Sequence, residues 1–287
     1  MMSARFLTVV LERAFNMRDG FGREIDYMRI SVIDSCNLNC YYCNPCDNNE
    51  HCHALNILSV KEVLCIVRAA TRLGIKHFRL TGGEPLLHPQ LDEMVLQIKK
   101  IPGVSSVSLT TNAVLLVQHA KWLKEAGIDS INVSLDTIEA SEYERITKKP
   151  LLEEVKHGIN AAIECGIRVK INVVLTPQTD VVALTRYVAK KGTDIRFIEM
   201  MPVGEGHTNG VEPYKKVIGT LSKLYGEPCR INTEKTKEIN SGNDKRKIPD
   251  NGPAEYYIFP ELGIRVGLIQ AIHGKFCDTC NRIRVTA

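Results

Sequence analysis

Residues 27–43 read YMRISVIDSCNLNCYYC, an apolar run followed at once by Cys36, Cys40 and Cys43. The run is rich in residues that favour strands, so it predicts a buried strand that ends where the thiols begin. Three thiolates can bind three irons of a four-iron cluster and leave the fourth iron open to a small molecule. The stretch therefore predicts a strand followed by a reactive loop, residues 36–43, which we call the cysteine loop.

Two other interpretations of the cysteine loop stay open on spacing alone. A structural zinc site would need a fourth Cys or His to complete a tetrahedron, and Cys46, His51, Cys52 and His53 follow closely. Alternatively, Cys46 could be the fourth ligand of a ferredoxin-like cluster, which would make the protein an electron carrier. Either alternative would give an iron–sulfur or zinc protein without catalysis.

The composition limits the class of protein. The chain has 287 residues, long enough for one large barrel or two domains, and its 37 basic and 33 acidic residues are too balanced for a nucleic-acid-wrapping surface. Most of its 10 cysteines lie in close clusters, which favours metal binding in a reducing compartment over disulfides. The apolar stretch within residues 1–15 is too short to span a membrane. We expect a cytoplasmic protein with no nucleic-acid or membrane partner.

A glycine followed by a short apolar run recurs along the chain. Each glycine follows a helix-like segment, where a left-handed cap is favoured, and each run predicts a strand. The predicted strands are residues 27–34, 75–80, 104–110, 128–135, 167–175 and 195–201. Strands alternating with helices predict an α/β protein with a parallel sheet, either open and doubly wound or a partial, six-unit TIM-type barrel. Ligands would then bind at the carboxyl ends of the strands.

The repeat ends near Met201. Residues 202–213 read as a loop, residues 214–225 as a helix, and residues 231–253 are polar. Apolar runs then return and lead to Cys277 and Cys280. We predict a barrel domain over residues 1–201 and a C-terminal region over residues 202–287 that covers it as a lid.

Four predicted strands carry a cation inside an otherwise apolar run. These strand cations are Arg29, Arg79, Lys170 and Arg196. A buried charge needs a partner, and alternation along the strands could gather all four around one cavity, which favours a polyanionic substrate. The alternative is that each cation pairs with its own carboxylate, such as Asp34, Asp136 or Glu199.

The end of the chain combines thiols and guanidinium groups. Cys277 and Cys280 have the two-residue gap of zinc or iron–sulfur ligands, and Arg282 and Arg284 lie on one side if the chain is extended. Guanidinium groups match phosphate oxygens, so this segment predicts metal and phosphate binding together.

A glycine pair follows the second predicted strand, in Thr81-Gly82-Gly83-Glu84-Pro85. Paired glycines allow a backbone to approach a ligand closely. This motif, one strand and helix after the cysteine loop, resembles the radical S-adenosylmethionine superfamily. The resemblance implies that S-adenosylmethionine chelates the open iron through its amino and carboxyl groups, and that the Gly-Gly-Glu-Pro segment contacts its methionine moiety.

Further segments resemble one family within that superfamily, the GTP 3',8-cyclases of molybdenum cofactor biosynthesis, known as MoaA. The resemblance covers nearly the whole chain in order, through residues 20–23, 29–32, 79–85, 110–112, 132–136, 170–174, 196–199, 252–254 and the final cysteine pair.

The resemblance implies two 4Fe-4S clusters and a set of binding residues. The first cluster would be held by Cys36, Cys40 and Cys43, and the second by Cys277 and Cys280. S-adenosylmethionine would lie against Tyr42, Gly83, Ser134 and Met201. GTP would be bound by Arg29, Arg79, Thr110, Lys170, Arg282, Ile283 and Arg284.

The family also implies a reaction. One electron, from a reduced flavodoxin- or ferredoxin-type donor, enters the first cluster and splits S-adenosylmethionine into methionine and a 5'-deoxyadenosyl radical. That radical takes hydrogen from C3' of GTP, and the carbon radical attacks C8 of guanine. The product, (8S)-3',8-cyclo-7,8-dihydroguanosine 5'-triphosphate, would pass to a cyclic pyranopterin monophosphate synthase, and the enzyme would be a monomer or homodimer.

Two departures from the family pattern qualify this expectation. A third cysteine and a Gly-Gly tail follow the cysteine pair in the family, whereas the sequence stops at Ala287 before either. We expect a fragment whose second cluster lacks its third ligand. Cys46, His51, Cys52 and His53 match no ligand of the family. The competing functions are another radical S-adenosylmethionine enzyme, acting on a peptide or a different nucleotide, and a non-catalytic iron–sulfur or zinc protein.

Overall fold

A computed structural model describes residues 17–43, 56–200, 213–231, 254–270, 272–274 and 280–286. Several residues singled out above lie outside these ranges: Cys46, His51, Cys52, His53, Met201, Cys277 and Ala287. The described strands form one sheet of ten strands in the order β10-β1-β2-β3-β4-β5-β6-β9-β8-β7.

The first six strands confirm the predicted repeat. They are β1 (Tyr27–Ser31), β2 (His77–Thr81), β3 (Ser106–Thr111), β4 (Ser130–Ser134), β5 (Arg168–Leu175) and β6 (Asp194–Glu199). Each is parallel to the next in chain order. The strand order is open at β10 and β7, so the sheet is the partial barrel of the prediction and not a closed one.

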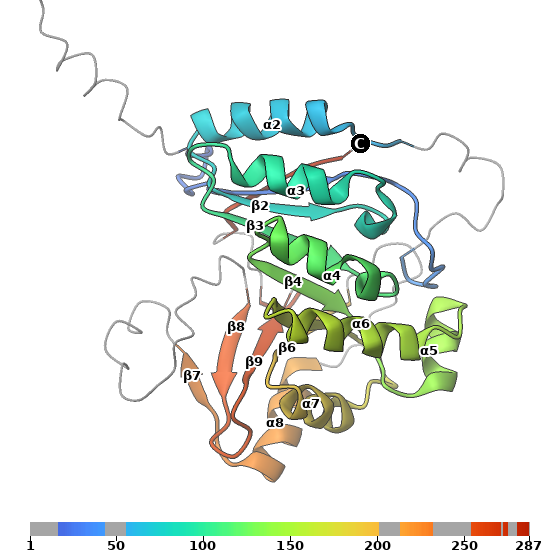
Figure 1. The fold of residues 1–287 in the computed structure, drawn as a ribbon. Coiled ribbons are helices and arrows are strands. Elements are labelled where there is room, and N and C mark those ends of the chain that lie inside the picture. Colours follow the sequence, from blue (N-terminus) through green and yellow to red (C-terminus); the bar gives the residue numbers. More distant parts are fainter. Residues whose placement is uncertain are drawn as a thin grey trace, which may run out of the picture.

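The helices that connect these strands cover one face of the sheet (Figure 1). They are α2 (Val60–Arg72), η1 (Pro85–Leu87), α3 (Leu91–Lys99), α4 (Leu116–Glu125), α5 (Ala140–Thr147), α6 (Leu152–Glu164) and α7 (Val181–Lys190), and α8 (Pro213–Tyr225) follows β6. The predicted glycine caps are present: Gly74, Gly103 and Gly127 have φ of 92°, 92° and 88°. Only glycine adopts this left-handed backbone without strain, so each helix ends there and the next strand begins.

The described strands of the C-terminal region join the sheet at both edges. β9 (Arg265–Ile269) is parallel to β6, and β8 (Glu255–Ile258) and β7 (Cys229–Ile231) continue antiparallel beyond it. β10 (Arg282–Val285) is parallel to β1 at the other edge. The prediction of a lid did not anticipate this arrangement. The edges of β1 and β6 carry backbone groups that need partners, and strands from the end of the chain supply them.

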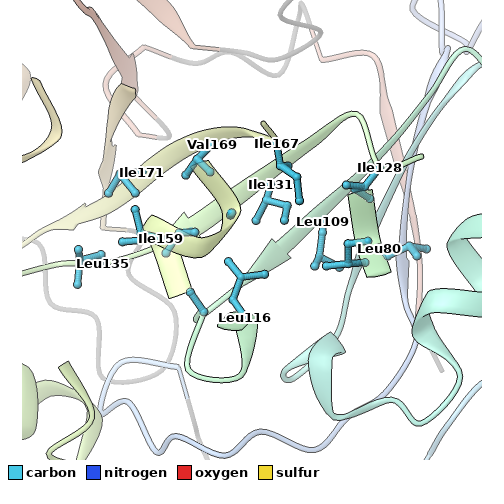
Figure 2. Close-up of a cluster of buried hydrophobic side chains, with 14 of the residues drawn as sticks. Leu80, Leu109, Leu116, Ile128, Ile131, Leu135, Ile159, Ile167, Val169 and Ile171 are labelled. Atoms are coloured by element: carbon cyan, nitrogen blue, oxygen red, sulfur yellow. The ribbon is translucent and has the colours of Figure 1, made fainter. Parts of the chain in front are cut away.

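Side chains alternate between the two faces of the strands. Those on the helical face are apolar and buried, and Figure 2 shows Leu80, Leu109, Ile131 and Val169 together with Ile159 of α6. The other face carries mainly polar and charged side chains, and we call it the polar face. No helix in the described residues is long and apolar enough to cross a membrane.

Candidate active site

The loops that follow β1 and β2 meet at the carboxyl-end edge of the sheet, because parallel strands end on the same side. The cysteine loop follows β1 and is fixed by backbone bonds to helix α5. The N–H of Asn39 donates to the carbonyl oxygen of Thr147 (3.0 Å), and the N–H of Tyr41 donates to that of Ile146 (3.1 Å). The loop is therefore held by a rigid helix.

The glycine pair after β2 packs against the chain that leads into the cysteine loop. The N–H of Gly83 donates to the carbonyl oxygen of Ile33 (2.7 Å), and the N–H of Glu84 donates to that of Ser35 (2.7 Å). A Cβ at Gly82 would overlap the carbonyl oxygen of Ile33, and one at Gly83 would overlap that of Ser35. The sequence predicted close approach to a ligand, and the structure gives close approach to the neighbouring backbone.

Glu84 ties this loop to the end of β3. Its carboxylate, 1% exposed, accepts from the Thr111 hydroxyl (2.6 Å), the Asn112 N–H (2.7 Å) and the Leu86 N–H (3.0 Å). Burial raises the pKa of Glu84, and these three hydrogen bonds oppose the rise. The Asn112 amide in turn donates to Asn37 Oδ1 (2.7 Å) and to Cys36 Sγ (3.8 Å). A chain of contacts thus runs from buried Glu84 to a cysteine sulfur.

Asp136, after β4, holds the other end of the cysteine loop. The Tyr42 hydroxyl donates to Asp136 Oδ2, and the N–H of Val174 donates to Asp136 Oδ1 (2.7 Å). Burial raises the pKa of Asp136 to about 6 and also raises that of Tyr42. Asp136 is thus engaged by Tyr42, not by a strand cation.

The donor set of the cysteine loop fits an iron–sulfur cluster. Its three cysteines are free thiols, and burial raises the pKa of Cys36 and raises that of Cys40 to about 12. Soft thiolates select iron–sulfur clusters, and metal binding deprotonates a coordinating thiol. Within the described residues, no three His, Cys, Asp or Glu side chains form a group that could hold a metal ion. In a four-iron cluster each thiolate binds a separate iron.

The register places the strand cations on the polar face. Arg29 lies opposite Arg79 on one side and opposite Arg284 on the other. Further along the sheet, Lys170 lies opposite Asn132, and Arg196 lies opposite Asn172. Positions two apart on a strand share a face, so all four strand cations and both tail arginines project from one side.

Arg196 is held by amides. It is 2% exposed, its Nε donates to Asn172 Oδ1 (2.9 Å) and its Nη2 donates to Asn132 Oδ1. Gly267 makes room for it, because a Cβ there would lie 2.7 Å from Arg196 Cγ. Neutral partners orient the guanidinium without neutralising its charge.

Arg79 and Arg29 are close to other arginines. Arg79 Nε donates to the Ser108 hydroxyl (3.0 Å), and burial, with nearby arginines adding to it, lowers the pKa of Arg79 to about 10. The pKa of Arg29 is lowered by burial and next by Arg284. Both remain charged at neutral pH. A bound anion would relieve the repulsion.

The carboxylates proposed as private partners have other contacts. Asp34 accepts from the Asn56 amide (2.9 Å), and Glu199 accepts from His273 and from the N–H of Ile272 (2.8 Å). Asp194, on the polar face, lies 3.6 Å from Arg168 and also contacts Arg265. Among the described residues, Asp34 and Glu199 therefore have partners other than the strand cations.

The remaining predicted site residues occupy different positions. Thr110 is half-buried on the polar face, and Ser134 is exposed where β4 ends. Lys170 is 4% exposed and lies 5.8 Å from the ring centre of Tyr256. Ile283 packs against the hydrophobic core, so only its backbone could contact a ligand on the polar face. Half-buried Cys280 lies two residues before β10.

Three residues that shape this site were not among the predicted ones: Tyr27, Asn132 and Asn172. Glu84 was predicted only as part of the Gly-Gly-Glu-Pro segment. Asn132 and Asn172 could have been found, because each is a polar amide inside an otherwise apolar run, and Asn172 lies two positions from Lys170. The contacts of Glu84 with Thr111 and Asn112 had no local signal, since they join segments 27 and 28 residues apart.

Comparison with known proteins identifies the class and then the family. Residues 30–184 match the Radical SAM superfamily, and residues 193–287 match Molybdenum Cofactor Synthesis C. The chain is 37% identical over 273 residues to a GTP 3',8-cyclase of Clostridium perfringens (strain SM101 / Type A), covering 94% of this chain and 80% of that protein. The GTP 3',8-cyclase of Pelotomaculum thermopropionicum is 37% identical over 278 residues, with 94% and 81% covered. The chain belongs to the GTP 3',8-cyclase family of the radical S-adenosylmethionine superfamily.

Solved structures agree on the fold. Streptococcus suis SuiB bound to S-adenosylmethionine superposes with a TM-score of 0.58 at 16% identity, over 69% of this chain and 47% of that one. Native anSMEcpe with bound AdoMet gives 0.56 at 19% identity, over 69% and 60%. Superfamily membership brings S-adenosylmethionine and an iron–sulfur cluster as cofactors, in agreement with the donor set above.

Proposed function

We propose that this protein is a lyase that cyclises GTP to (8S)-3',8-cyclo-7,8-dihydroguanosine 5'-triphosphate, the first step of molybdenum cofactor biosynthesis. The observation that carries the proposal is the polar face, where cations of five strands gather: Arg29, Arg79, Lys170, Arg196, Arg282 and Arg284. A triphosphate supplies the negative charge that such a group of cations requires. Membership in the GTP 3',8-cyclase family supports the same substrate.

The position of the cations relative to the cysteines supports this reaction. The cysteine loop follows the carboxyl end of β1, whereas Cys280 lies two residues before β10, which is parallel to β1. Cys280 and the cysteine loop therefore lie toward opposite ends of these strands. β1 has five residues, a length of about 17 Å, and Arg29 is its central residue. A nucleotide bound at the cations would extend between the two ends.

We assign the binding roles as follows. Cys36, Cys40 and Cys43 hold the first cluster, and Tyr42, Gly83, Ser134 and Met201 surround S-adenosylmethionine. Arg29, Arg79, Thr110, Lys170, Arg282, Ile283 and Arg284 bind GTP. When bound, the first cluster supplies the electron that splits S-adenosylmethionine. The residues of this chain bind and orient the triphosphate. The backbone contacts of the cysteine loop with α5 keep that loop in place.

The remaining assignments complete the proposal. Residues 1–201 form the barrel domain, and residues 202–287 form the second-cluster and GTP-binding region. Cys277 and Cys280 hold a second 4Fe-4S cluster. A reduced flavodoxin- or ferredoxin-type donor supplies electrons, a cyclic pyranopterin monophosphate synthase consumes the product, and the enzyme is a monomer or homodimer.

Anaerobic reconstitution with iron and sulfide, followed by dithionite, tests the proposal. We expect S-adenosylmethionine cleavage and a GTP-dependent cyclised nucleotide, detected by mass spectrometry, with ATP as the matched control. Cleavage without a GTP-dependent product would leave another radical enzyme, and absence of cleavage would leave a non-catalytic protein. Iron analysis separates about eight atoms per chain from about four, which tests the second cluster.

Variants of the tail arginines test the substrate site separately. Arg282→Ala and Arg284→Ala should each weaken GTP binding and leave S-adenosylmethionine binding unchanged, because both arginines lie on the polar face away from the cysteine loop. Equal loss of both ligands would contradict the assignment.

A further inference from the structure

Tyr27 lies among the arginines of the polar face. It is the first residue of β1, is 4% exposed, and shares the polar face with Arg29, two positions on. Its register partners are His77 on β2 and Arg282 on β10. The ring is therefore flanked by both strands that carry neighbouring arginines.

Two guanidinium groups lie over the Tyr27 ring. Arg282 Cζ lies 4.9 Å from the ring centre and Arg79 Cζ lies 5.4 Å from it. The two arginines come from strands on opposite sides of β1. An aromatic ring attracts a cation most strongly where water is excluded, as it is around this buried ring. The ring thus holds together two cations that would otherwise repel each other.

The Tyr27 hydroxyl makes no hydrogen bond within the described part of the chain. It is buried and has no hydrogen-bond partner among the described residues, and the same is true of Nε of neighbouring Arg29. A buried hydroxyl without a partner costs free energy that an apolar side chain would avoid. Two such atoms on one strand, within a group of cations, indicate donors that are ready for an anion.

We propose that Tyr27 is a positioning residue of the triphosphate site, whose ring sets the spacing of Arg79 and Arg282 and whose hydroxyl donates to a phosphate oxygen. This inference rests on the proposed function, since the anion is the triphosphate of GTP. The ring acts through the arginines, and the hydroxyl acts directly.

Two variants separate these roles in the reconstituted full chain. Tyr27→Phe keeps the ring and removes the hydroxyl, and we expect GTP binding to weaken about tenfold, the usual loss of a hydrogen bond to a charged group. Tyr27→Leu removes the ring as well, and we expect about a hundredfold weakening. Inorganic triphosphate, as a competitor, should weaken by the same factors, whereas S-adenosylmethionine binding should not change.

The melting temperature without GTP distinguishes this proposal from a purely structural role of Tyr27, in which removal of the hydroxyl would lower it. Removing an unpartnered buried hydroxyl should leave the melting temperature of Tyr27→Phe unchanged or raise it. Tyr187→Phe is the matched control, because the Tyr187 hydroxyl is also buried without a partner in the described structure and Lys191 lies 5.7 Å from its ring centre. We expect that variant to bind GTP as the wild type does.

The outcomes are distinct. If the wild-type chain binds GTP and Tyr27→Phe binds it equally well, the role of the hydroxyl is wrong. Equal weakening of GTP and S-adenosylmethionine by Tyr27→Leu would show a general structural effect and overturn the role of the ring. If the wild type does not bind GTP, the proposed function fails, and this inference fails with it.

Discussion

The two faces of the sheet are made by the same strands, yet the helical face forms the hydrophobic core and the polar face forms the candidate binding site. On β2, Phe78 is fully buried against the helices, whereas the next residue, Arg79, lies with other cations on the polar face. On β6, Phe197 and Arg196 show the same contrast. The helical face stabilises by excluding water, and the polar face holds charges in place at a cost in repulsion. Adjacent residues should therefore respond in opposite ways to substitution.

The largest effect is expected on the helical face. Phe78→Ala should lower the free energy of unfolding by about 3 to 5 kcal/mol, because it leaves a cavity in a packed core. Chemical denaturation of the variant measures this loss. Phe78→Leu, which fills much of the same volume, should lose considerably less. An equal loss in both variants would mean that cavity formation is not the cause.

The neighbouring residue should show the reverse pattern. Arg79→Met should weaken GTP binding about a hundredfold, equivalent to about 2.7 kcal/mol, while the free energy of unfolding changes by less than about 1 kcal/mol. The reason is that the methionine keeps the apolar stem but removes a charge crowded by Arg29 and Arg282. Calorimetry with GTP and denaturation of the same sample measure both quantities. A stability loss as large as that of Phe78→Ala would contradict the division between the faces.

A third prediction concerns Glu84, in the loop that follows the carboxyl end of β2. Glu84→Gln should lower the free energy of unfolding by about 1 to 3 kcal/mol, because one amide oxygen cannot replace a carboxylate that accepts three hydrogen bonds in a buried place. It should also weaken S-adenosylmethionine binding, since Asn112 would lose its fixed contact near Cys36.

Glu62→Gln provides the matched control for Glu84. Glu62 is an exposed carboxylate that caps α2 by accepting from Ser59 (2.8 Å to its N–H). Its loss should cost less than that of Glu84 and leave S-adenosylmethionine binding unchanged. Similar effects of both variants would show that burial of Glu84 is unimportant.

The smallest effect concerns pH. Burial lowers the pKa of His77, at the start of β2, below its model-peptide value of 6.5. As the pH falls below that value, the unfolded chain takes up a proton that the folded chain resists, so stability should fall. In His77→Gln, the decline in unfolding free energy between about pH 7 and pH 5 should be less steep. Denaturation at several pH values tests this, and an unchanged slope would rule out His77 as a contributor.

Much of the fold could be predicted because its signals are local. The apolar runs and the glycines that end the helices gave the six parallel strands, and Gly74 and Gly103 have the left-handed backbone expected of them. The candidate cluster ligands followed from the spacing of cysteines on one loop. The strand cations were recognised because a charge inside an apolar run is unusual at any position.

The contacts between distant segments could not be predicted. Nothing near Glu84 indicates that it accepts from Thr111, and nothing near Tyr27 indicates that Arg282, 255 residues later, covers its ring. The positions of β9 beside β6 and of β10 beside β1 were likewise unexpected, because this pairing depends on which strand edges remain unpaired once the six parallel strands have formed.

The sequence by itself determined the strand and helix order, the thiols of the cysteine loop and the cations on alternate strand positions, since these depend on periodicity and spacing along the chain. Only the tertiary structure decided that β10 lies beside β1, so that Arg282 and Arg284 join Arg29 and Arg79 around Tyr27. The physical reason is that a charge cluster is a property of distances in space, and strand pairing brings together residues that the chain keeps far apart.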